Sequence, residues 1–500
     1  MWAPDQESGP LEFPQLIPRS GGAQGWHAAC KVAFQLDPAS DPSGAIALLE
    51  DALPAAPSKD KPGPLANRSG TVSRNMTIAL LGNAFPPLVA LFSGPILAQA
   101  LGVDGRGEVA AATAPLALVV TVATFGIPEA VTWAIARKPA LARNAAGRGM
   151  LILIIAGLFA TAAIVFSPPL LSGGDPQVQG LIVITSLAIV PNLLVGILRG
   201  VASATNSWRL VSMERILSST LRLAVLIPFW LTGTLTPLVA AVTVAAMPVV
   251  GAFVYIGRMR SLDPRALQVP PEARMLGLLS YGSRMWVGSL SGVLLTRLDQ
   301  VLMTPLAGTH ELGLYVVAVS ISELPLVIHH AVRDVSFVNE AADSADDRLS
   351  ASARISTALS ALAALVLGIS MLWWLPVLFG EGFRESIPIA AVLLVAVVLL
   401  TPGSIAGAGL SARGRPGLRS LALTISCVIN VAMLFVLAPL LGAMGAALTT
   451  LVANIITSNL NLLFLSRVFG VGMLQFYGLR RSDLATVGRA GKRMLRRKAR

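Results

Sequence analysis

The stretch VLLTRLDQVLMTPLAGTHELGLYVVAVSISELPLVI, residues 293–328, places three charged side chains, Arg297, Asp299 and Glu323, inside long runs of Val, Leu and Ile. A glycine-containing turn near 305–313 divides it into two apolar parts. Apolar segments of about 20 residues can cross a hydrocarbon core of about 30 Å. Burying an ion there costs about 2.5 kcal/mol or more. The stretch therefore predicts two membrane-spanning helices whose charged groups face a partner or a water-filled cavity.

The rest of the chain has the same character. Of its 500 residues, 54% are apolar and 13% are charged, and the mean hydropathy is +0.71, whereas about a quarter of residues are charged in soluble domains. A β-barrel would show alternating segments of about ten residues instead. The pattern predicts an all-α polytopic membrane protein with about twelve spans: 77–98, 108–136, 149–167, 178–199, 209–232, 236–257, 278–304, 312–333, 354–379, 386–410, 418–440 and 443–466.

The basic residues predict the orientation of these spans. Arg and Lys gather in alternate connecting segments, as at 137–148 and 258–274, whereas the opposite segments hold only Arg106 and Arg384. Because cytoplasmic loops carry the excess of Lys and Arg, both termini should lie on the cytoplasmic side of the cell membrane. Much of the net charge of +12 lies in 479–500, where we expect contact with anionic lipid headgroups rather than nucleic acid, because no nucleic-acid-reading module accompanies it.

The chain also contains an internal repeat. LGVDGRGEVAAAT from Leu101 resembles LAGTHELGLYVVAV from Leu306, and the alignment pairs Gly102 with Gly308 and Gly107 with Gly313, each 206 residues apart. Chance similarity between apolar helices is the alternative, but a second pair of motifs keeps nearly the same offset. Six spans in each half give both halves one orientation, so a pseudo-two-fold axis along the membrane normal should relate two six-helix bundles.

Four regions follow from these patterns. Residues 1–75, rich in Pro, Ser and Gly, should form a disordered cytoplasmic leader, and Met76 is an alternative start. We expect an N-terminal lobe over 76–257, a C-terminal lobe over 258–467 and a basic cytoplasmic tail over 468–500.

Two longer segments resemble a known family. LGVDGRGEVAAATAPLALVVTVATFGIPEAV (101–131) and SYGSRMWVGSLSGVLLTRLDQVLMTPLAGTHELGLYVVA (280–318) are similar to signatures of polysaccharide and O-antigen flippases, within the multidrug/oligosaccharidyl-lipid/polysaccharide exporter superfamily. LFGEGFRESIPIAAVLL and LLGAMGAALTTLVA resemble two further family segments, so the resemblance covers about 75–467.

The resemblance implies two bundles around a central cavity that opens alternately to each side. Its implied cargo is an oligosaccharide on a polyprenyl pyrophosphate, used in cell-surface polysaccharide assembly. Membrane lipids, and a polysaccharide polymerase or glycosyltransferases, are the other partners to consider.

Two arginines are the leading candidates for contact with an anionic cargo. Arg222 lies near the middle of its span, and only Glu214, at the span's end, shares that span with it as an acid. Arg297 and Asp299 lie about 200° apart around a helix and so cannot be simple partners. One should line the cavity while the other meets a neighbouring helix. There are structural alternatives for these residues. Arg222 could pair with Asp299 or Glu323, and Arg297 and Asp299 could form contacts between helices that only fix the register of the bundle.

Five further side chains complete the expected site. Arg284 is a weaker cargo candidate, because it could extend to the headgroups instead, and Asn83 shares a span with two adjacent prolines. Asp299, Glu323 and Glu129 are expected to form ion pairs or to carry a coupling proton or cation, and Glu323 directly precedes a leucine and a helix-bending proline.

Two other function classes fit the sequence less well. A multidrug/cation antiporter of the same superfamily typically has an acidic residue in the first helix, and 77–98 has none. An enzyme acting on polysaccharide needs carboxylates in a sizeable outer loop, and the outer loops are short. No Gly-x-x-x-x-Gly-Lys-Ser/Thr motif or metal-ligand spacing occurs. We therefore expect no catalytic activity, cofactor or metal.

Overall fold

The computed structural model describes residues 65–260, 275–342, 344–478, 480 and 483. Contacts divide the chain into two units, 1–71 and 72–500, and the second holds everything discussed below. Most of the predicted leader and the end of the predicted tail lie outside the described residues. The leader was predicted to reach residue 75, but the first described helix begins at Leu65. Pro64 is the last proline of the leader, so helix can form directly after it.

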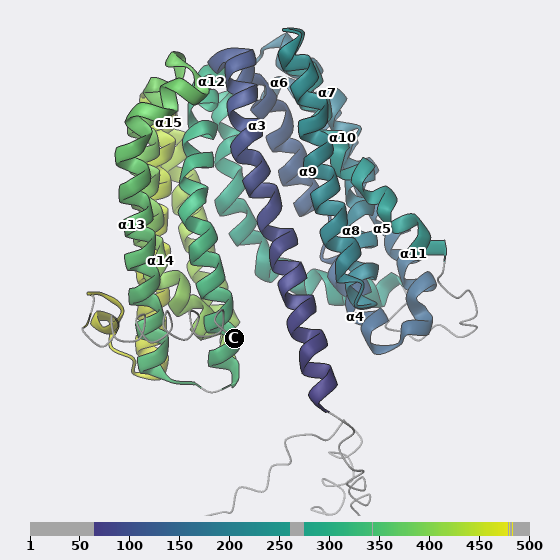
Figure 1. The fold of residues 1–500 in the computed structure, drawn as a ribbon, viewed down its shortest axis with the longest axis vertical. Helices are drawn as coiled ribbons and strands as arrows, with labels where there is room; N and C mark the ends of the chain where they lie inside the picture. The colour runs from purple at the N-terminus through teal and green to yellow at the C-terminus, as the bar shows by residue number, and fades with distance from the viewer. Residues whose placement is uncertain (1–64, 261–274, 343, 479, 481–482, 484–500) are drawn as a thin grey trace, which may run out of the picture. The chain divides into compact units, whose positions relative to one another are not determined.

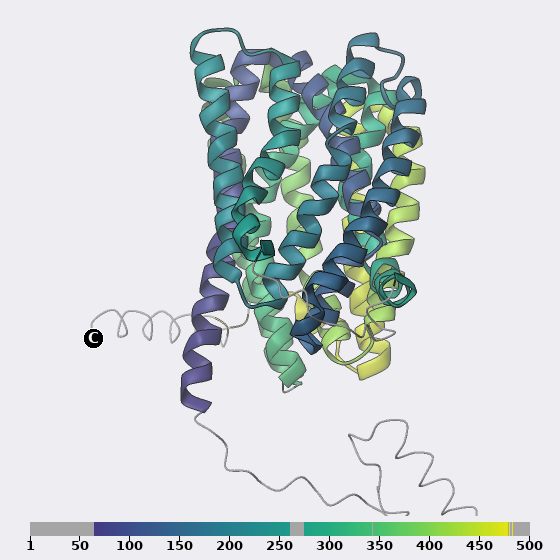
Figure 2. The ribbon, with the colours of Figure 1, turned by 90° about the vertical axis from the view of Figure 1, so that its right-hand side faces the viewer.

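The described residues are helical throughout, with no strand among them. Figures 1 and 2 show the helices of the larger unit running along a common direction. In the N-terminal lobe they are α3 (Leu65–Val122), α4 (Ile127–Arg137), α5 (Ala142–Phe166), α6 (Pro168–Leu171), α7 (Pro176–Ser186), α8 (Ile189–Ala204), α9 (Trp208–Leu231), α10 (Pro237–Gly251) and α11 (Ile256–Arg260). The C-terminal lobe consists of α12 (Met275–Ala342), α13 (Asp346–Phe379), α14 (Ser386–Ala412) and α15 (Pro416–Phe469).

Three of these helices are long because a single glycine turns each of them. Gly102 in α3, Gly308 in α12 and Gly442 in α15 have φ values of 66°, 90° and 58°, which glycine adopts without steric cost. All three fall between spans predicted from the sequence. Among the described residues, eight segments are long and apolar enough to cross a membrane, which makes this a multi-pass membrane protein. The count of twelve spans stays a prediction.

The predicted span 108–136 is wrong in one respect, because it is interrupted. α3 ends at Val122 and α4 begins at Ile127, with Phe125 and Gly126 between them in the left-handed region. Pro128 fits this arrangement, because proline suits the first turn of a new helix, where its missing N–H is not needed.

The outer helices expose large apolar side chains. Phe159 on α5 and Trp373 on α13 are 75% and 73% exposed, whereas most of the apolar stretch of α14 is buried. Such a belt would be an interaction surface in water. Around a membrane-spanning bundle it is the surface that lipid covers.

The lobes meet in a reciprocal contact that reflects the repeat. A Cβ on Gly107 would overlap the carbonyl oxygen of Thr309, and a Cβ on Gly313 would overlap the carbonyl oxygen of Val103. Each residue of one contact lies 206 positions from its counterpart in the other. This pairwise exchange is what a pseudo-two-fold axis between the lobes requires. We call these four residues the glycine seam.

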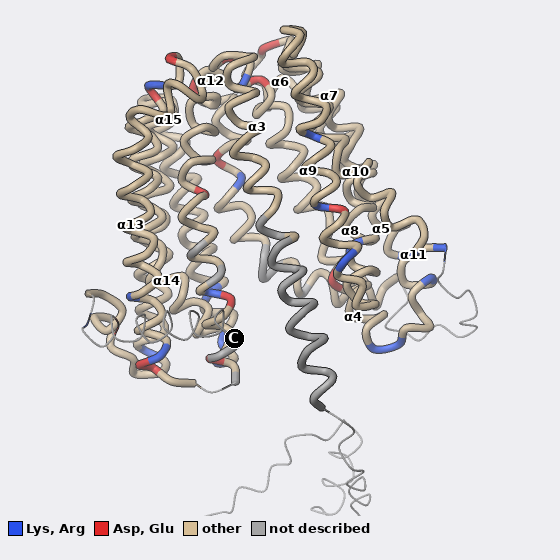
Figure 3. Tube along the Cα trace, viewed as in Figure 1, with Lys and Arg blue, Asp and Glu red and all other residues tan. Residues whose placement is uncertain are grey.

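The seam lies at the end of the bundle that carries few arginines. There His310 pairs with Asp104 at 2.8 Å, and Gln99 donates to the carbonyl of Leu378 at 2.9 Å. At the opposite end, which we call the Arg-rich end, lie the connecting segments 137–148, 199–209, 333–354 and 413–419; Figure 3 shows the distribution of charge. The lobes also meet toward that end, where Trp133 stacks on Tyr281 with ring centroids 4.6 Å apart.

A buried ion pair ties the segment after α15 to the C-terminal lobe. Arg354 binds both carboxylate oxygens of Asp483 at 2.7 Å and donates to the carbonyl of Gln475 at 2.5 Å. Their side chains are 4% and 2% exposed. Hydrogen bonding to this guanidinium holds the pKa of the Asp483 carboxyl below its usual value.

Candidate functional site

The C-terminal lobe contains a polar cavity. It has a volume of about 290 Å³ and is walled by α12, α14 and α15. Hydroxyl, amide and ionisable side chains line it together with apolar ones such as Leu295, Val319 and Leu393. Its ionisable residues are Asp299, Tyr315, Glu323, His329, His330, Arg333 and Arg419.

Asp299 lies on the wall of this cavity and is held by two donors. Its carboxylate accepts the hydroxyl of Tyr315 at 2.5 Å and the backbone N–H of Gln300 at 2.8 Å. The Tyr315 hydroxyl also lies 3.3 Å from that of Thr450 on α15. Asp299 is 6% exposed. The carboxylate thus joins both halves of α12 to α15.

Glu323 and Arg297 are brought close to Asp299. Glu323 lines the cavity and is exposed, and Arg297 is exposed as well. Arg297 is near enough to interact electrostatically with both carboxylates, but it forms no ion pair with a described residue. Asp299 is therefore buried, whereas Arg297 is exposed and has no ion-pair partner among the described residues.

His329 also belongs to this site, and the sequence analysis did not single it out. Its ring is 1% exposed, and its Nε2 lies 2.9 Å from the Ser404 hydroxyl. Its Nδ1 is buried without a partner, as are the Thr457 hydroxyl and the Asn461 carbonyl oxygen. Buried polar groups are rarely left unsatisfied, so a small polar occupant such as water or a cation suits the cavity. The signal in the sequence was a stripe at helical spacing: Ser322, Glu323, His329, His330 and Arg333.

The N-terminal lobe brings two arginines together. Arg222 on α9 donates to the Ser93 hydroxyl at 3.3 Å, and Arg106 on α3 lies near enough to Arg222 to repel it electrostatically. The Nε of each is buried without a partner. No described carboxylate pairs with either, so Arg222 does not meet Asp299 or Glu323.

The position of Arg106 was predicted wrongly. The sequence analysis placed it in a connecting loop, but α3 resumes directly after the turn at Gly102. Because one glycine makes the whole turn, Arg106 lies in the following helix rather than in a loop.

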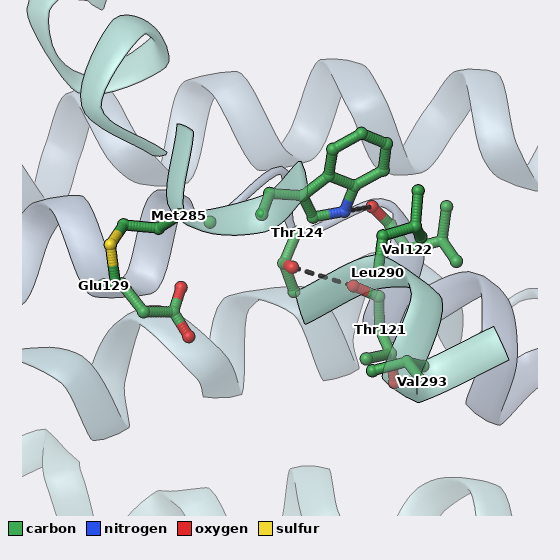
Figure 4. Close-up of a pocket in the computed structure, with 9 residues that line it drawn as sticks. Thr121, Val122, Thr124, Glu129, Met285, Leu290 and Val293 are labelled. Carbon is green, nitrogen blue, oxygen red and sulfur yellow. Dashed lines mark hydrogen bonds between the residues drawn. The ribbon is translucent and has the colours of Figure 1, made fainter. Parts of the chain in front are cut away.

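Glu129 lines a separate pocket between the lobes. This pocket has a volume of about 330 Å³, with α3 and α4 on one side and α12 on the other. Figure 4 shows Glu129 beside Met285, with Thr124 and Thr121 further along the pocket. The Glu129 side chain is exposed and has no hydrogen bond or ion pair to a described residue. Asn83 and Arg284 lie in α3 and α12, but their side chains are outside the described part of the chain.

Comparison with protein families gives one match. A family model described as "Polysaccharide biosynthesis protein" matches residues 72–337, which is more than half of the chain. No curated protein matches.

Three solved structures illustrate the fold. An inward-facing multidrug resistance MATE family transporter of the MOP superfamily is 15% identical, with 78% of this chain and 97% of that chain covered and a TM-score of 0.62. The lipid II flippase MurJ, in an inward closed conformation, is 13% identical, with 78% and 87% covered and a TM-score of 0.65. A MOP superfamily transporter from Pyrococcus furiosus is 14% identical, with 82% and 96% covered and a TM-score of 0.53. These matches establish an all-α membrane fold shared with MOP superfamily transporters.

Proposed function

The chain belongs to the polysaccharide biosynthesis protein family, and we propose that it is a flippase that moves a polyprenyl-pyrophosphate-linked oligosaccharide across the cytoplasmic membrane. Its cargo would serve the assembly of cell-surface polysaccharide. The fold shared with MOP superfamily transporters supports a transport role rather than catalysis.

The observation that carries this proposal is the pair of arginines in the N-terminal lobe. Arg106 and Arg222 lie close together, and no described carboxylate neutralises them. Like charges within a membrane-spanning bundle are costly unless water or an anion compensates them. The planar fork of arginine matches the oxygens of phosphate. A pyrophosphate would therefore supply the charge that the lobe lacks, with Arg297 as a third contact on the C-terminal lobe.

Movement of the two lobes would carry the cargo across the membrane. The glycine seam closes the end that carries few arginines. On the positive-inside rule the Arg-rich end is cytoplasmic, so both termini lie there. Separation of the seam would then open a path to the outer side, in an alternating-access cycle.

The cavity in the C-terminal lobe is the place for the coupling ion in this scheme. Asp299 and Glu323 supply carboxylates, and the unsatisfied groups around His329 supply further polar contacts. Carboxylates inside a membrane bundle commonly form proton or ion pathways. The sequence has no phosphate-binding loop for ATP, so an ion gradient or the membrane potential is the proposed source of energy.

Complementation of flippase-deficient cells tests this function. Wild type, Arg106→Ala, Arg222→Ala and Arg297→Ala would be compared at matched membrane levels, with Arg384→Ala as control because Arg384 is 70% exposed in a loop. Restored surface polysaccharide in wild type and control, but not in the three variants, is the expected result. Normal activity of the variants would remove the arginine site. Drug resistance without polysaccharide, in several backgrounds, would favour a multidrug/cation antiporter.

A further inference from the structure

The cavity of the C-terminal lobe has two ends of different charge. Asp299 and Glu323 line one part of it, and Arg333 and Arg419 line another. Arg333 lies ten residues after Glu323 on α12, which is about 15 Å along a helix. Arg419, on α15, is near enough to Arg333 for the two charges to repel each other. We call the part of the cavity lined by Arg333 and Arg419 its basic end, and it lies toward the Arg-rich end of the bundle.

Arg419 lines the basic end without an acid of its own. It is partly buried and makes no hydrogen bond or ion pair with a described residue. Buried arginines in the same part of the molecule do have such partners. Arg354 is paired with Asp483. Arg413 is paired with Glu340. Arg419 therefore differs from the arginines that hold this part of the fold together.

The position of Arg419 in its helix gives the fold no stability either. Arg419 lies in the first turn of α15, which contains no acidic residue. The N-terminus of a helix carries a partial positive charge, which disfavours a cation there. The guanidinium of Arg333 adds a second positive charge nearby. This arrangement costs free energy unless an anion compensates it.

The other polar groups near the two arginines leave this positive charge in place. Asp334 accepts hydrogen bonds from Arg333 at 3.1 and 3.2 Å, but its side chain is 64% exposed, and exposed ion pairs are weak. His329 and His330 line the same cavity, with ring centroids 5.4 Å apart. The Nδ1 of His329 is buried without a partner. Two arginines thus face one exposed acid, beside a buried ring nitrogen that lacks a hydrogen bond.

A phosphate group has the charge and the geometry that this end of the cavity lacks. Its oxygens match the planar fork of arginine, so two guanidinium groups can bind one phosphate. We infer that the basic end of the cavity binds a phosphate group through Arg333 and Arg419. The phosphate comes either from the headgroup of an anionic phospholipid, which attracts arginines at a membrane surface, or from phosphate free in solution.

This site goes beyond the cargo contacts of the proposed function. It contains none of Arg106, Arg222 and Arg297, and it lies in the same cavity as Asp299 and Glu323. The inference does not rest on the identity of the cargo.

Binding to the purified full-length protein in detergent tests the site. The probes are inorganic phosphate and dioctanoyl phosphatidic acid, titrated calorimetrically at constant ionic strength in chloride, and dioctanoylglycerol is the control probe without phosphate. The variants are Arg333→Ala, Arg419→Ala and Arg419→Lys. Arg415→Ala is the matched control, because Arg415 is exposed and does not line the cavity. Each variant is also made in an Arg222→Ala background, which separates binding in the N-terminal lobe.

We expect wild type to bind at least one phosphate probe and not to bind dioctanoylglycerol. Arg333→Ala and Arg419→Ala should each weaken that binding by about tenfold or more, the effect of losing a hydrogen bond between charged groups. Arg419→Lys should lose less, because the ammonium keeps the charge without the fork. Arg415→Ala should match wild type, and the loss caused by Arg419→Ala should persist in the Arg222→Ala background.

The two probes distinguish the sources of the phosphate. Arg419-dependent binding of inorganic phosphate would show that free phosphate is sufficient. Arg419-dependent binding of phosphatidic acid alone would assign the site to a lipid headgroup. In phosphate-free buffer the melting temperature of Arg419→Ala should equal or exceed that of wild type, because the substitution removes an uncompensated charge.

Several results would overturn the site. These are no binding of either probe to wild type, equal binding to wild type and to Arg419→Ala, or an equal loss in Arg415→Ala, which would indicate a general effect of surface charge. Complete loss of binding in Arg222→Ala would assign the phosphate to the N-terminal lobe instead. A lower melting temperature of Arg419→Ala with unchanged binding would assign Arg419 a structural role. None of these results decides the complementation experiment, so the site can fail while the proposed function stands.

Discussion

The two lobes carry different chemistry at positions that the repeat makes equivalent. Asp299 and Tyr315 are hydrogen bonded in the C-terminal lobe, and the residues 206 positions earlier are Ser93 and Val109. Ser93 accepts a hydrogen bond from Arg222. One lobe therefore places an acid where the other places a hydroxyl beside an arginine.

This difference shows how one scaffold can serve two tasks. The lobes share their glycine turns and the reciprocal seam, so their backbones follow the same plan. Their interiors differ in charge: the first lobe holds arginines without described acids, whereas the cavity of the second is lined by the carboxylates of Asp299 and Glu323 together with Arg333 and Arg419. Under the proposed function, the first lobe holds the anionic cargo and the second holds the coupling cation.

The largest loss of stability should come from breaking a buried ion pair, compared with breaking an exposed one. The side chains of Arg354 and Asp483 are both buried, whereas those of the pair Arg384 and Glu381 are 70% and 76% exposed. Breaking a buried pair costs about 3 kcal/mol or more, so Asp483→Asn should lower the stability of the detergent-solubilised protein clearly. Arg384→Ala, which breaks the exposed pair with Glu381, should cost about 1 kcal/mol or less. Equal losses of melting temperature would contradict this contrast.

The Arg354–Asp483 pair also predicts that the stability of the protein depends on pH. Because the pKa of Asp483 is lowered in the folded protein, the stability that it contributes is complete above the usual carboxyl pKa of about 3.9 and is lost as the pH falls through the lowered value. Thermal unfolding of wild type and Asp483→Asn should therefore converge at acid pH. A constant difference down to that range would be the contrary result.

The glycine seam tests what the lobes share. Gly107→Val and Gly313→Val should each force the lobes apart at the seam, because a Cβ meets a backbone carbonyl at either position. Overpacking costs about 1–3 kcal/mol, enough to reduce the closed state by about tenfold. Spin labels on opposite sides of the seam would measure this separation. Gly180→Val is the control, since nothing lies near that site. A large separation caused by only one of the two substitutions would contradict the equivalence of the two seam positions.

Ser93→Asp makes the first lobe resemble the second. A carboxylate at this position would pair with Arg222, which already contacts Ser93. The arginine charge would then be satisfied internally, and the affinity for farnesyl pyrophosphate should fall by about tenfold, the effect of a charged hydrogen bond. Isothermal titration calorimetry checks this value, with Ser93→Ala as the uncharged control. Unchanged affinity in Ser93→Asp would mean that Arg222 does not bind the phosphate.

Tyr315→Phe changes the surroundings of the acid in the second lobe. It removes the hydroxyl that donates to the Asp299 carboxylate but keeps the ring, so the free energy of unfolding should fall by about 1.5–3 kcal/mol, the range for a hydrogen bond to a charged group. The pH dependence of transport should change as well, because Asp299 loses a donor. Val109→Ala, at the equivalent position of the other lobe, is the comparison and should leave that pH dependence unchanged.

The amino-acid sequence by itself determined the membrane architecture. Run lengths, the steady offset of about 206 residues and the glycine-containing turn near 305–313 predicted an all-α protein with two related halves. The turns at Gly102, Gly308 and Gly442 fall between predicted spans. These features are local, because helix length, hydropathy and the conformational freedom of glycine depend on neighbours in the chain. The break before α4 was missed, although Pro128 offered a local signal.

Only the tertiary structure decided which polar side chains meet. Arg106 lies beside Arg222, His329 faces Ser404, and Glu129 shares a pocket with Trp286. Each pair joins residues far apart in the chain. Their proximity depends on how each helix is rotated about its axis and against which neighbour it packs. Hydropathy does not encode that rotation, because apolar side chains surround most of these helices and many rotations bury similar area.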